Sequence, residues 1–295
     1  MKENSIFVII INYCNATDTI ETVKSLLDSS VVPTIVVVDN ASKDDSYEIL
    51  KRSLPPDVVL IVAEQDNGFS AGNNIGIKYA LEHEAQYVML LNNDTIVDRY
   101  MISNLLKFTN HNNVTSPKMY YYDYPNRIWF AGGLFNKLSG RFIHIGYNET
   151  DSLLYDKNIS CDFLSGCCIM MSSEVLLKVG FLDESYFMYY EDVDFSVRLK
   201  LENKELLMVS EAKLWHKVGA SSGGELSRFN IYYGNRNRLF LLKKFKFSLF
   251  IRTVTILSRI ILMIKGVLLG TNQKYIWYSL IDYFLNRTGK QERRY

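Results

Sequence analysis

Cysteine and long uncharged apolar runs are both scarce in this sequence of 295 residues. None of the four cysteines forms a C-x-x-C pair, and the adjacent Cys167 and Cys168 cannot easily bridge to each other. We therefore interpret them, together with Cys14 and Cys161, as small buried apolar residues in a reducing compartment. The N-terminal apolar run is too brief for a signal sequence and predicts a strand. We expect a cytoplasmic protein.

Signatures of several other protein classes are missing. No G-x-G-x-x-G motif follows the first apolar run, which argues against a dinucleotide-dependent oxidoreductase. A nucleotidyltransferase is disfavoured because no glycine-rich phosphate loop lies near the N-terminus. Residues 1–227 carry a net charge of −11 and contain no nucleic-acid-binding module. We therefore expect no nucleic-acid partner.

Apolar segments alternate with amphipathic ones through the first third of the chain. Continuous apolar runs predict buried strands at 6–11, 34–40, 58–63 and 87–94, and helical spacing predicts helices at 17–28, 44–54 and 71–84. Further on, the patterns predict short antiparallel strands within 114–170, helices at 173–179 and 191–201, a strand at 205–210 and a flexible loop at 219–225. This order predicts an α/β protein with a doubly wound, mostly parallel sheet.

Polar residues follow three of the predicted strands. Asp39 ends the second strand, Asn67-Gly68-Phe69 follows the third, and Asn92-Asn93-Asp94 ends the fourth. Each cluster alone is equally explained by helix capping or turn formation. Because ligands of such sheets bind beyond the carboxyl ends of the strands, three clusters in succession favour a ligand site at one edge.

Six segments occur in order between residues 8 and about 223: "VIIINYCN", "VVVDNASKDDS", "NGFSAGNNIG", "LLNNDTIV", "FLSGCCIMMSSEVLLKVGFLDESYFMYYEDVDFSVRL" and "WHKVGASSG". Together they resemble the family 2 glycosyltransferases with the GT-A fold, and within them the rhamnosyltransferase-like enzymes of bacterial polysaccharide assembly. The resemblance implies a GT-A catalytic domain at 1–227, a Rossmann-like sheet with helices on both faces. A basic, apolar helical region follows at 228–295.

The resemblance also implies a binding site for a nucleoside-diphosphate sugar. In similar enzymes the residues matching Tyr13 and Asp39 hold the base and ribose, although a core position at a strand end also explains Tyr13. The loop Asn67–Asn73 lines the donor pocket, where Gly68 permits close approach of the backbone. Other residues with expected donor contacts are Asn73, Asn93, Asp94, Gly166 and Arg236. Arg236 and its neighbour Arg238 are equally explained as surface charge.

A divalent cation, Mn²⁺ or Mg²⁺, is the cofactor that the resemblance implies. Asp94 matches the last acid of the family's D-x-D motif, whereas Asn92 replaces the first acid. His216 matches a position that contributes a metal ligand in related enzymes, and imidazole suits Mn²⁺ better than Mg²⁺. A structural hydrogen-bonding role explains His216 equally well. A cation held by oxygen ligands neutralises the charge of a departing diphosphate.

The chemistry is expected at the acid pair Glu191-Asp192. Family members carry such a pair at the beginning of a helix, and its second acid acts as general base. We therefore predict Asp192 as the base and Glu191 as the residue that orients the acceptor. The helix dipole alone also favours acids here, and it is sufficient to explain Asp194. A single displacement opposite the leaving diphosphate would invert the anomeric configuration.

The C-terminal region differs from the rest in charge. Residues 228–295 contain 14 Lys and Arg against two acids, a net charge of +12. On a helical wheel Ser248, Arg252, Thr255, Arg259 and Gly266 form one stripe opposite an apolar face, and charges interrupt every run long enough to span a bilayer. We expect peripheral attachment to an anionic membrane surface; packing on the catalytic domain or in a homodimer is the alternative.

Taken together, the sequence predicts an inverting, non-processive glycosyltransferase, because the Q-x-x-R-W motif and spanning helices of processive synthases are absent. The expected donor is dTDP-rhamnose, and the expected acceptor is a hydroxyl of a glycan, for which a polyprenyl-linked glycan is the first choice. UDP-linked hexose or N-acetylhexosamine is the alternative donor. Because Asn92 weakens the metal motif, an inactive glycan-binding scaffold stays open as a second class.

Overall fold

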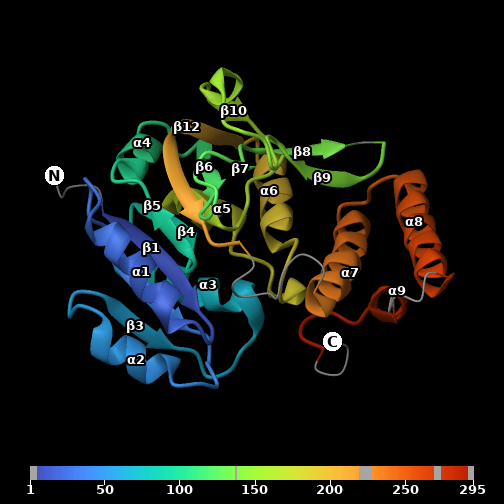
Figure 1. The fold of residues 1–295 in the computed structure, drawn as a ribbon, viewed down its shortest axis with the longest axis horizontal. Coiled ribbons are helices and arrows are strands. Elements are labelled where there is room, and N and C mark those ends of the chain that lie inside the picture. Colours follow the sequence, from blue (N-terminus) through green and yellow to red (C-terminus); the bar gives the residue numbers. More distant parts are fainter. Residues whose placement is uncertain (1–4, 137, 219–226, 269–273, 292–295) are drawn as a thin grey trace.

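The computed structural model describes residues 5–136, 138–218, 227–268 and 274–291. A mixed sheet in the strand order β10-β12-β6-β11-β4-β1-β2-β3 forms its centre (Figure 1). The strands are β1 (Ile6–Asn12), β2 (Thr34–Asp39), β3 (Val59–Val62), β4 (Tyr87–Asn92), β5 (Thr95–Val97), β6 (Asn113–Tyr121), β7 (Ile128–Phe130), β8 (Gly133–Asn136), β9 (Arg141–His144), β10 (Ile159–Ser160), β11 (Cys168–Ser172) and β12 (Glu205–His216). Strands β4, β1, β2 and β3 are parallel, as predicted.

Helices cover both faces of the sheet. The helices that do so are α1 (Ala16–Leu27), α2 (Ser46–Ser53), α3 (Gly68–Glu82), α4 (Met101–Leu106), α5 (Ser173–Val179) and α6 (Glu191–Leu201). The chain also forms α7 (Arg228–Lys244), α8 (Leu249–Leu268), α9 (Lys274–Phe284) and single 3-10 turns at Leu153–Tyr155 and Glu184–Tyr186. Side chains alternate along β1: Val8 and Ile10 pack with α1, α2 and α4, whereas Phe7 and Ile9 pack with α3, α5 and α6. Burial on both faces explains why these strands are continuous apolar runs.

The region 114–170 differs in part from the prediction of short antiparallel strands. Strand β6 is a nine-residue strand that pairs parallel with β12 and antiparallel with β11. Strand β12 continues past the predicted end at residue 210 to His216, with a register shift between Val209 and Lys213. The bulge breaks the alternation of apolar residues, so the strand predicted from the sequence ended too early. The antiparallel hairpin β8–β9 agrees with the prediction.

Helix α3 begins three residues earlier than the sequence predicted. Its first turn is Gly68–Ala71, so most of the expected loop 67–73 is helical. Glycines obscured this start, because they usually mark loops. Here a Cβ on Gly76 would lie 2.4 Å from Cγ2 of Ile9, so the glycine allows the helix to lie close against β1.

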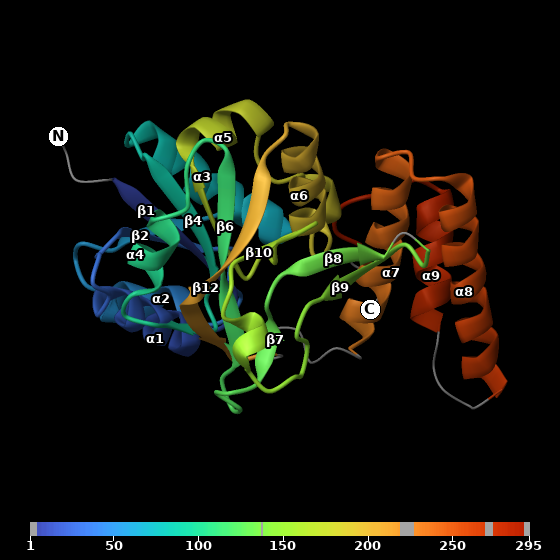
Figure 2. The same ribbon diagram turned by 90° about the horizontal axis from the view of Figure 1, so that it is seen from above.

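Helices α7, α8 and α9 form a cluster at one end of the molecule, on the side of α6 and the β8–β9 hairpin (Figures 1 and 2). Leu239 of α7 packs against Ile276 and Leu280 of α9, and Tyr232 donates a hydrogen bond to Asp282 at 2.6 Å. None of the described helices is long and apolar enough to cross a membrane. The predicted division of the chain at residues 227 and 228 stays a prediction, and the loop expected at 219–225 lies outside the described residues.

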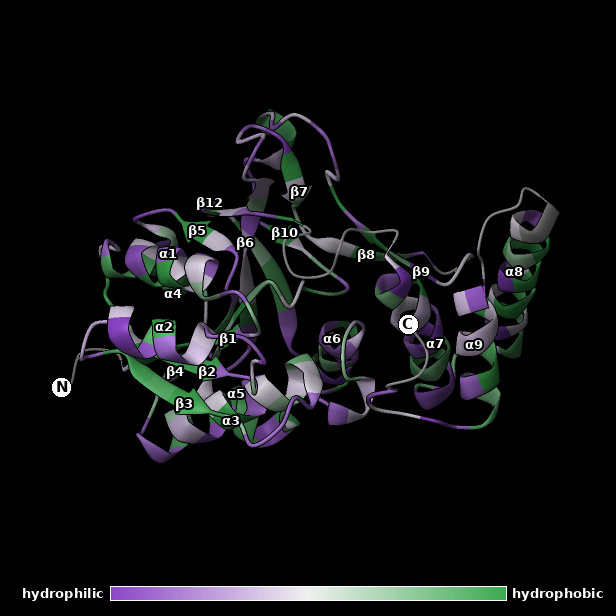
Figure 3. Ribbon diagram, turned by 60° about the horizontal axis from the view of Figure 1, so that its bottom comes forward, coloured by the Kyte–Doolittle hydropathy of each residue, from purple (hydrophilic) through white to green (hydrophobic). Residues whose placement is uncertain are grey.

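The amphipathic pattern predicted for the C-terminal region occurs in α8, which is largely apolar in colour in Figure 3. Its polar stripe faces the protein: Thr255 is 1% exposed, and the Nε atoms of Arg252 and Arg259 are buried. The opposite face is open to solvent. Its exposed apolar side chains are those of Phe250, Leu257, Ile261 and Ile264.

Candidate active site

Strand ends from different parts of the chain meet at one edge of the sheet. Asn12 at the end of β1 pairs with Asp39 at the end of β2, and Asn92 at the end of β4 pairs with Ile11. The backbone N–H of Asn92 donates to the carbonyl of Cys167, which places the start of β11 at the same edge. The structure therefore brings the polar clusters after β2 and β4 together, as the parallel topology requires.

Asp39 is held rigidly at this edge. It is 1% exposed, and its Oδ1 accepts hydrogen bonds from Asn12 at 2.7 Å and from the Ser42 hydroxyl at 2.7 Å. The Ser42 backbone N–H donates to Oδ2 at 3.1 Å. Tyr13, which follows β1 directly, is 41% exposed, so its ring is open to a ligand rather than buried in the core. The pair has the composition of a base and ribose site: an accessible ring beside a fixed carboxylate.

The donor loop lies against the aromatic segment that precedes α6. Gly68 has φ = +88°, and a Cβ on it would lie 2.1 Å from the carbonyl oxygen of Phe187. The N–H of Phe69 donates to that same oxygen at 2.8 Å. Asn73 donates to the Phe69 carbonyl at 2.9 Å and is buried. Only glycine fits at position 68, because both the backbone conformation and the close contact exclude a side chain.

Asp94 and His216 form a buried acid–imidazole pair. His216 Nε2 lies 3.1 Å from Asp94 Oδ1, yet that oxygen and His216 Nδ1 have no hydrogen-bond partner among the described residues. Because the contact between Asp94 Oδ1 and His216 Nε2 is short but lacks hydrogen-bond geometry, Asp94 Oδ1 stays available to a further ligand. No group of three or more His, Cys, Asp or Glu in the described residues is arranged to hold a metal ion. The two side chains therefore fit a cation only as part of a shell that a ligand completes.

Asn93 contributes to the scaffold through hydrogen bonds to α1. Its amide donates to Thr19 Oγ1 at 3.0 Å, and its carbonyl accepts from Thr22 at 2.7 Å. These bonds fasten the end of β4 to α1. Asn93 is thereby placed at the predicted edge, and its contact with a donor stays a prediction.

The acid pair occupies the first turn of α6, as predicted. Glu191 is 5% exposed, and its Oε2 has no hydrogen-bond partner among the described residues. Burial, and then the nearby charges of Asp192 and Asp194, raise the pKa of Glu191 well above its usual range. Burial also raises the pKa of Asp192, but its carboxylate accepts from the N–H groups of Gly166 and Val193, each at 2.8 Å. The proton of the pair therefore belongs on Glu191 and the negative charge on Asp192.

Gly166 and Cys167 connect the acid pair to the sheet edge. A Cβ on Gly166 would lie 3.3 Å from Cβ of Asp192 and 3.4 Å from the ring of Phe69. Burial first, and then the charges of Asp94 and Asp192, raise the pKa of the Cys167 thiol. Both carboxylates therefore lie near this thiol, at the start of β11. The cysteine prediction holds for Cys161, Cys167 and Cys168, which are buried and free, but Cys14 is exposed.

A strained aromatic loop leads into α6. Phe187, Tyr189 and Tyr190 all have positive φ, at 65°, 67° and 73°. Non-glycine residues in this region cost about 1–3 kcal/mol each, so the surrounding structure must hold them in place. Asn237 of α7 does so: it is fully buried, and its Nδ2 lies 2.9, 2.8 and 2.9 Å from the carbonyl oxygens of Tyr186, Met188 and Tyr189.

Arg236 supports the same loop from its other side. It is fully buried and donates to the Tyr186 carbonyl at 3.3 Å, to the Gly289 carbonyl at 2.8 Å and to Asn237 Oδ1 at 2.9 Å. Its guanidinium lies 4.8 Å from the ring centroid of Tyr233. These contacts assign Arg236 to the junction between α7 and the aromatic loop. A contact with a donor diphosphate stays a prediction.

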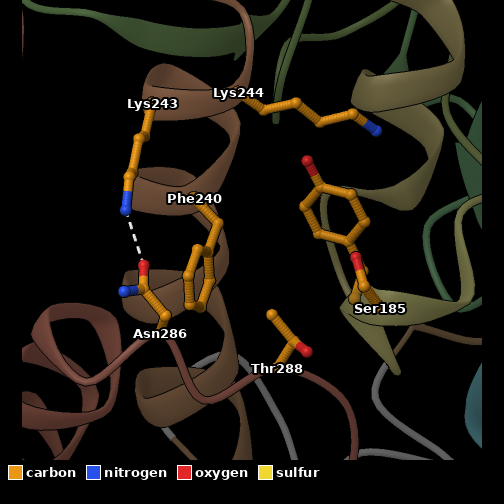
Figure 4. A pocket seen from close by; sticks show the side chains of 7 residues that line it. Ser185, Phe240, Lys243, Lys244, Asn286 and Thr288 are labelled. Carbon is orange, nitrogen blue, oxygen red and sulfur yellow. Dashed lines mark hydrogen bonds between the residues drawn. The ribbon is translucent and has the colours of Figure 1, made fainter.

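Asp194 is a structural anchor of this junction. It is fully buried and accepts from Tyr186 Oη at 2.9 Å and Arg198 Nε at 2.8 Å, and it forms an ion pair with Lys244 of α7. Figure 4 shows the neighbouring cavity of about 360 Å³, with Lys243 bonded to Asn286 and Lys244 extended across it. None of the predicted site residues lines this cavity. Its two lysines are already paired, so we assign it no ligand.

Sequence reasoning missed the residues that fasten the site. Asn12 holds Asp39, Asn237 holds the aromatic loop, and Lys290 donates to Asp66 beside the donor loop at 2.7 Å. Asn12 was detectable, since it is a polar residue at the end of the first apolar strand. Nothing in the local sequence marks Asn237 or Lys290, because their partners are about 50 and 224 residues away.

The fold is that of the GT-A class: a mostly parallel sheet with Asp39, an acid–imidazole pair and an acid pair near the carboxyl ends of its strands. The glycosyl transferase family 2 model matches residues 5–180, and the chain belongs to this family. It is an enzyme, a glycosyltransferase.

Among curated proteins, the chain is similar to the low-salt glycan biosynthesis hexosyltransferase Agl10 of Haloferax volcanii, with 29% identity over 97% of this chain and 93% of that protein. It is also similar to the dTDP-rhamnosyl transferase RfbF of Shigella flexneri, with 27% identity over 71% of each. Solved structures of similar fold include the mannosyltransferase PcManGT of Pyrobaculum calidifontis in complex with GDP-Man and Mn²⁺, with a TM-score of 0.60, 12% identity and coverage of 96% and 87%. GalNAc-T7 with UDP, GalNAc and Mn²⁺ matches with a TM-score of 0.61, 15% identity and coverage of 82% and 48%.

Proposed function

We propose that this glycosyltransferase moves a sugar from a nucleoside-diphosphate donor to a hydroxyl of a glycan acceptor, with inversion at the anomeric carbon. The observation that carries the proposal is the position of Asp192. Its carboxylate is held by the Gly166 N–H at 2.8 Å, at the sheet edge that also holds Asp39 and Asp94. A base fixed there can reach a reaction centre at the mouth of a donor site.

The proposed reaction is a single displacement. Asp192 accepts the proton of the acceptor hydroxyl while that oxygen forms a bond to the anomeric carbon. The bond from the anomeric carbon to the diphosphate oxygen breaks, and the nucleoside diphosphate leaves with its electron pair. Protonated Glu191, whose Oε2 has no partner among the described residues, donates a hydrogen bond that orients the acceptor. Cys167 takes no part, because its pKa is raised and no covalent intermediate is needed.

A divalent cation fits the Asp94–His216 pair in the proposed enzyme. The unpaired Asp94 Oδ1 and the buried imidazole 3.1 Å away supply two ligands, and diphosphate oxygens would supply others. When bound, the cation neutralises the charge of the departing diphosphate. Solved structures of similar fold that contain Mn²⁺ support this assignment.

For the donor we propose dTDP-rhamnose, with a UDP-linked hexose or N-acetylhexosamine as the alternative. The relative RfbF, named a dTDP-rhamnosyl transferase, supports the first choice, and the relative named a hexosyltransferase supports the second. An inactive glycan-binding scaffold is the remaining candidate, since Asn92 stands where the family motif has an acid.

We further propose that α8 attaches the enzyme to an anionic membrane surface, on the cytoplasmic side. The exposed face of Phe250, Leu257, Ile261 and Ile264 is apolar, and the C-terminal region carries a net charge of +12. Apolar insertion combined with positive charge is the combination that binds anionic bilayers. The Ile261→Asp variant should lose binding to phosphatidylglycerol vesicles while remaining monomeric. If instead the wild type sediments as a dimer that this variant disrupts, the face is a homodimer interface.

Titration calorimetry tests the donor assignment. The purified protein is titrated with dTDP, UDP and GDP, each with and without Mn²⁺. Binding of dTDP or UDP that requires Mn²⁺, and that the His216→Gln variant loses, supports donor and cation together. Metal-independent binding removes the cation from the proposal. An absence of binding by all three nucleotides would favour the scaffold.

A further inference from the structure

Helices α7 and α8 and the β8–β9 hairpin meet at one end of the molecule (Figure 2), and together they carry four arginines that concern us here. Arg238 of α7 is 5% exposed and donates to the carbonyls of Ser139 and Gly140 in the hairpin turn, at 2.8 and 3.1 Å. The turn itself rests on α8: a Cβ on Gly140 would lie 2.5 Å from Ile251 and 3.6 Å from Thr255 Oγ1. The other three arginines are Arg141 in the hairpin and Arg252 and Arg259 on the inward stripe of α8.

These guanidiniums have no acidic partner in the part of the chain that the structure describes. No ion pair among the described residues involves any of the four. The groups that influence the charge of Arg259 most strongly are Arg238, Arg141 and the Tyr190 hydroxyl. Burial, and then repulsion from Arg238, lowers the pKa of Arg259 to about 10. Positive charge is therefore concentrated at a partly buried place where no carboxylate of the described residues forms an ion pair with it.

Arg252 Nη2 donates to Tyr283 Oη at 3.4 Å, but other hydrogen-bonding groups at the junction have no partner among the described residues. Along one stripe of α8, Arg252 Nε, Thr255 Oγ1 and Arg259 Nε are buried without a hydrogen-bond partner in the described part of the chain. Thr255 is 1% exposed. Buried donors are almost always satisfied in folded proteins, so this stripe indicates a ligand that accepts hydrogen bonds. Guanidinium groups fit the oxygens of phosphate in both charge and geometry.

We propose that this arginine cluster, composed of Arg141, Arg238, Arg252 and Arg259 with Thr255, is a binding site for a phosphate or diphosphate group. The site contains none of the residues predicted for the donor pocket, and its neighbour Tyr190 lies near the charges of Arg238 and Arg259 and also near that of Asp192. The ring of Tyr190, directly before Glu191, packs against Phe142 of the hairpin with centroids 6.1 Å apart. The exposed apolar face of α8 lies directly behind the cluster, so a phosphate here would lie between a membrane surface and the acid pair.

Which molecule supplies the phosphate is inferred from the proposed function. A lipid-linked acceptor carries a diphosphate between its lipid and its glycan, which would place the glycan toward Asp192 when the diphosphate binds the arginines. An anionic phospholipid headgroup offers the same chemistry. We assign the phosphate class to the site, and the experiment separates the two sources.

The test is a calorimetric titration of the full chain with inorganic pyrophosphate, without divalent metal or nucleotide. We expect Arg259→Gln and Arg141→Gln to weaken binding about tenfold each, the loss of one charge-assisted contact. Arg52→Gln, which removes an exposed arginine on α2, is the matched control and should bind as the wild type does. His216→Gln should also bind normally. Binding that His216→Gln loses and Arg259→Gln retains would overturn the proposal, because the pyrophosphate would then occupy the donor pocket.

Thermal melting supplies a second readout. Arg259→Gln removes one of several mutually repelling charges, so we expect a melting temperature equal to or above that of the wild type without ligand. Pyrophosphate should raise the melting temperature of the wild type but not that of the variant. A variant that melts lower, with unchanged pyrophosphate affinity, would make Arg259 a packing residue and overturn the site.

Two further arms separate the sources. If farnesyl diphosphate binds more tightly than pyrophosphate, and Arg259→Gln loses this binding, the ligand of the site is the diphosphate of the acceptor. If Arg259→Gln loses binding to phosphatidylglycerol vesicles, and the wild type shows no preference for farnesyl diphosphate, the ligand of the site is a phospholipid headgroup. None of these titrations uses a sugar donor. A failure of the proposed transferase would therefore appear as absent nucleotide binding, while a failure of this site would appear as unchanged pyrophosphate affinity.

Discussion

Replacing Asn237 by alanine should damage both folding stability and catalysis, although the residue lies outside the acid pair. Its Nδ2 has two hydrogens, which are shared among three carbonyl oxygens at 2.8–2.9 Å in a fully buried environment. Each buried acceptor left unsatisfied costs about 1–3 kcal/mol, so the loss of two such bonds predicts roughly 2–6 kcal/mol. A stable domain of 5–15 kcal/mol tolerates this, so the variant should still fold.

The catalytic effect follows from the strained loop. Without Asn237, the positive φ values of Tyr189 and Tyr190 lose the contacts that hold them, and the first turn of α6 can shift. A displacement of the base by about 1 Å can reduce turnover about a hundredfold. Urea unfolding followed by tryptophan fluorescence measures the stability, and initial rates of sugar transfer measure turnover.

Asn235→Ala is the matched control for this experiment. Asn235 lies on the same helix and donates one hydrogen bond, to the Ile231 carbonyl one turn earlier. Its removal should change the free energy of unfolding by less than about 1 kcal/mol. If Asn237→Ala matched this control in stability and turnover, the assignment of Asn237 as a positioning residue would be refuted.

Three other substitutions test separate parts of the site. Gly68→Ala should lower transfer at least about a hundredfold, since its Cβ would lie 2.1 Å from the Phe187 carbonyl; near-normal rates would show that the donor loop does not depend on this contact. The stability that Glu191 contributes is fully present below its unfolded pKa of 4.5 and is lost as the pH rises through its raised folded pKa. The stability of Glu191→Gln relative to the wild type should therefore increase above pH 4.5. A difference in urea midpoints that does not change with pH would contradict this. His216→Gln should abolish stimulation by Mn²⁺ while leaving the melting temperature within a few degrees, and unchanged stimulation would exclude His216 as a ligand.

The sheet and its carboxyl edge were predictable because their signals are local. Continuous apolar runs identified β1 to β4, and Asp39 and Asp94 stand where those runs end. The beginning of α3 was not predictable, because Gly68 belongs to a residue type that usually marks a loop and its close contact is with Phe187, far along the chain. The full length of β12 was hidden by its bulge at Val209–Lys213.

Long-range contacts account for the rest of what the sequence did not disclose. The stripe of α8 was recognisable as polar, but its inward orientation depends on the β8–β9 hairpin more than 100 residues earlier. Asn237 has no distinguishing neighbours, and its role exists only because α7 packs beside the aromatic loop. Asp192 was predicted from its place in a motif, whereas the division of charge with Glu191 depends on burial and on the N–H of Gly166.

The central claim is that Asp192 is the base of an inverting displacement, and proton NMR of the product at early reaction times tests it most directly. The purified enzyme is supplied with dTDP-rhamnose or a UDP-hexose and a soluble glycan acceptor, and the wild type is compared with Asp192→Asn. We predict a product whose anomeric configuration is opposite to that of the donor. Asp192→Asn should be slower by about 100- to 10,000-fold with normal nucleotide affinity. A product that retains the donor's configuration, or full activity in Asp192→Asn, would contradict the account.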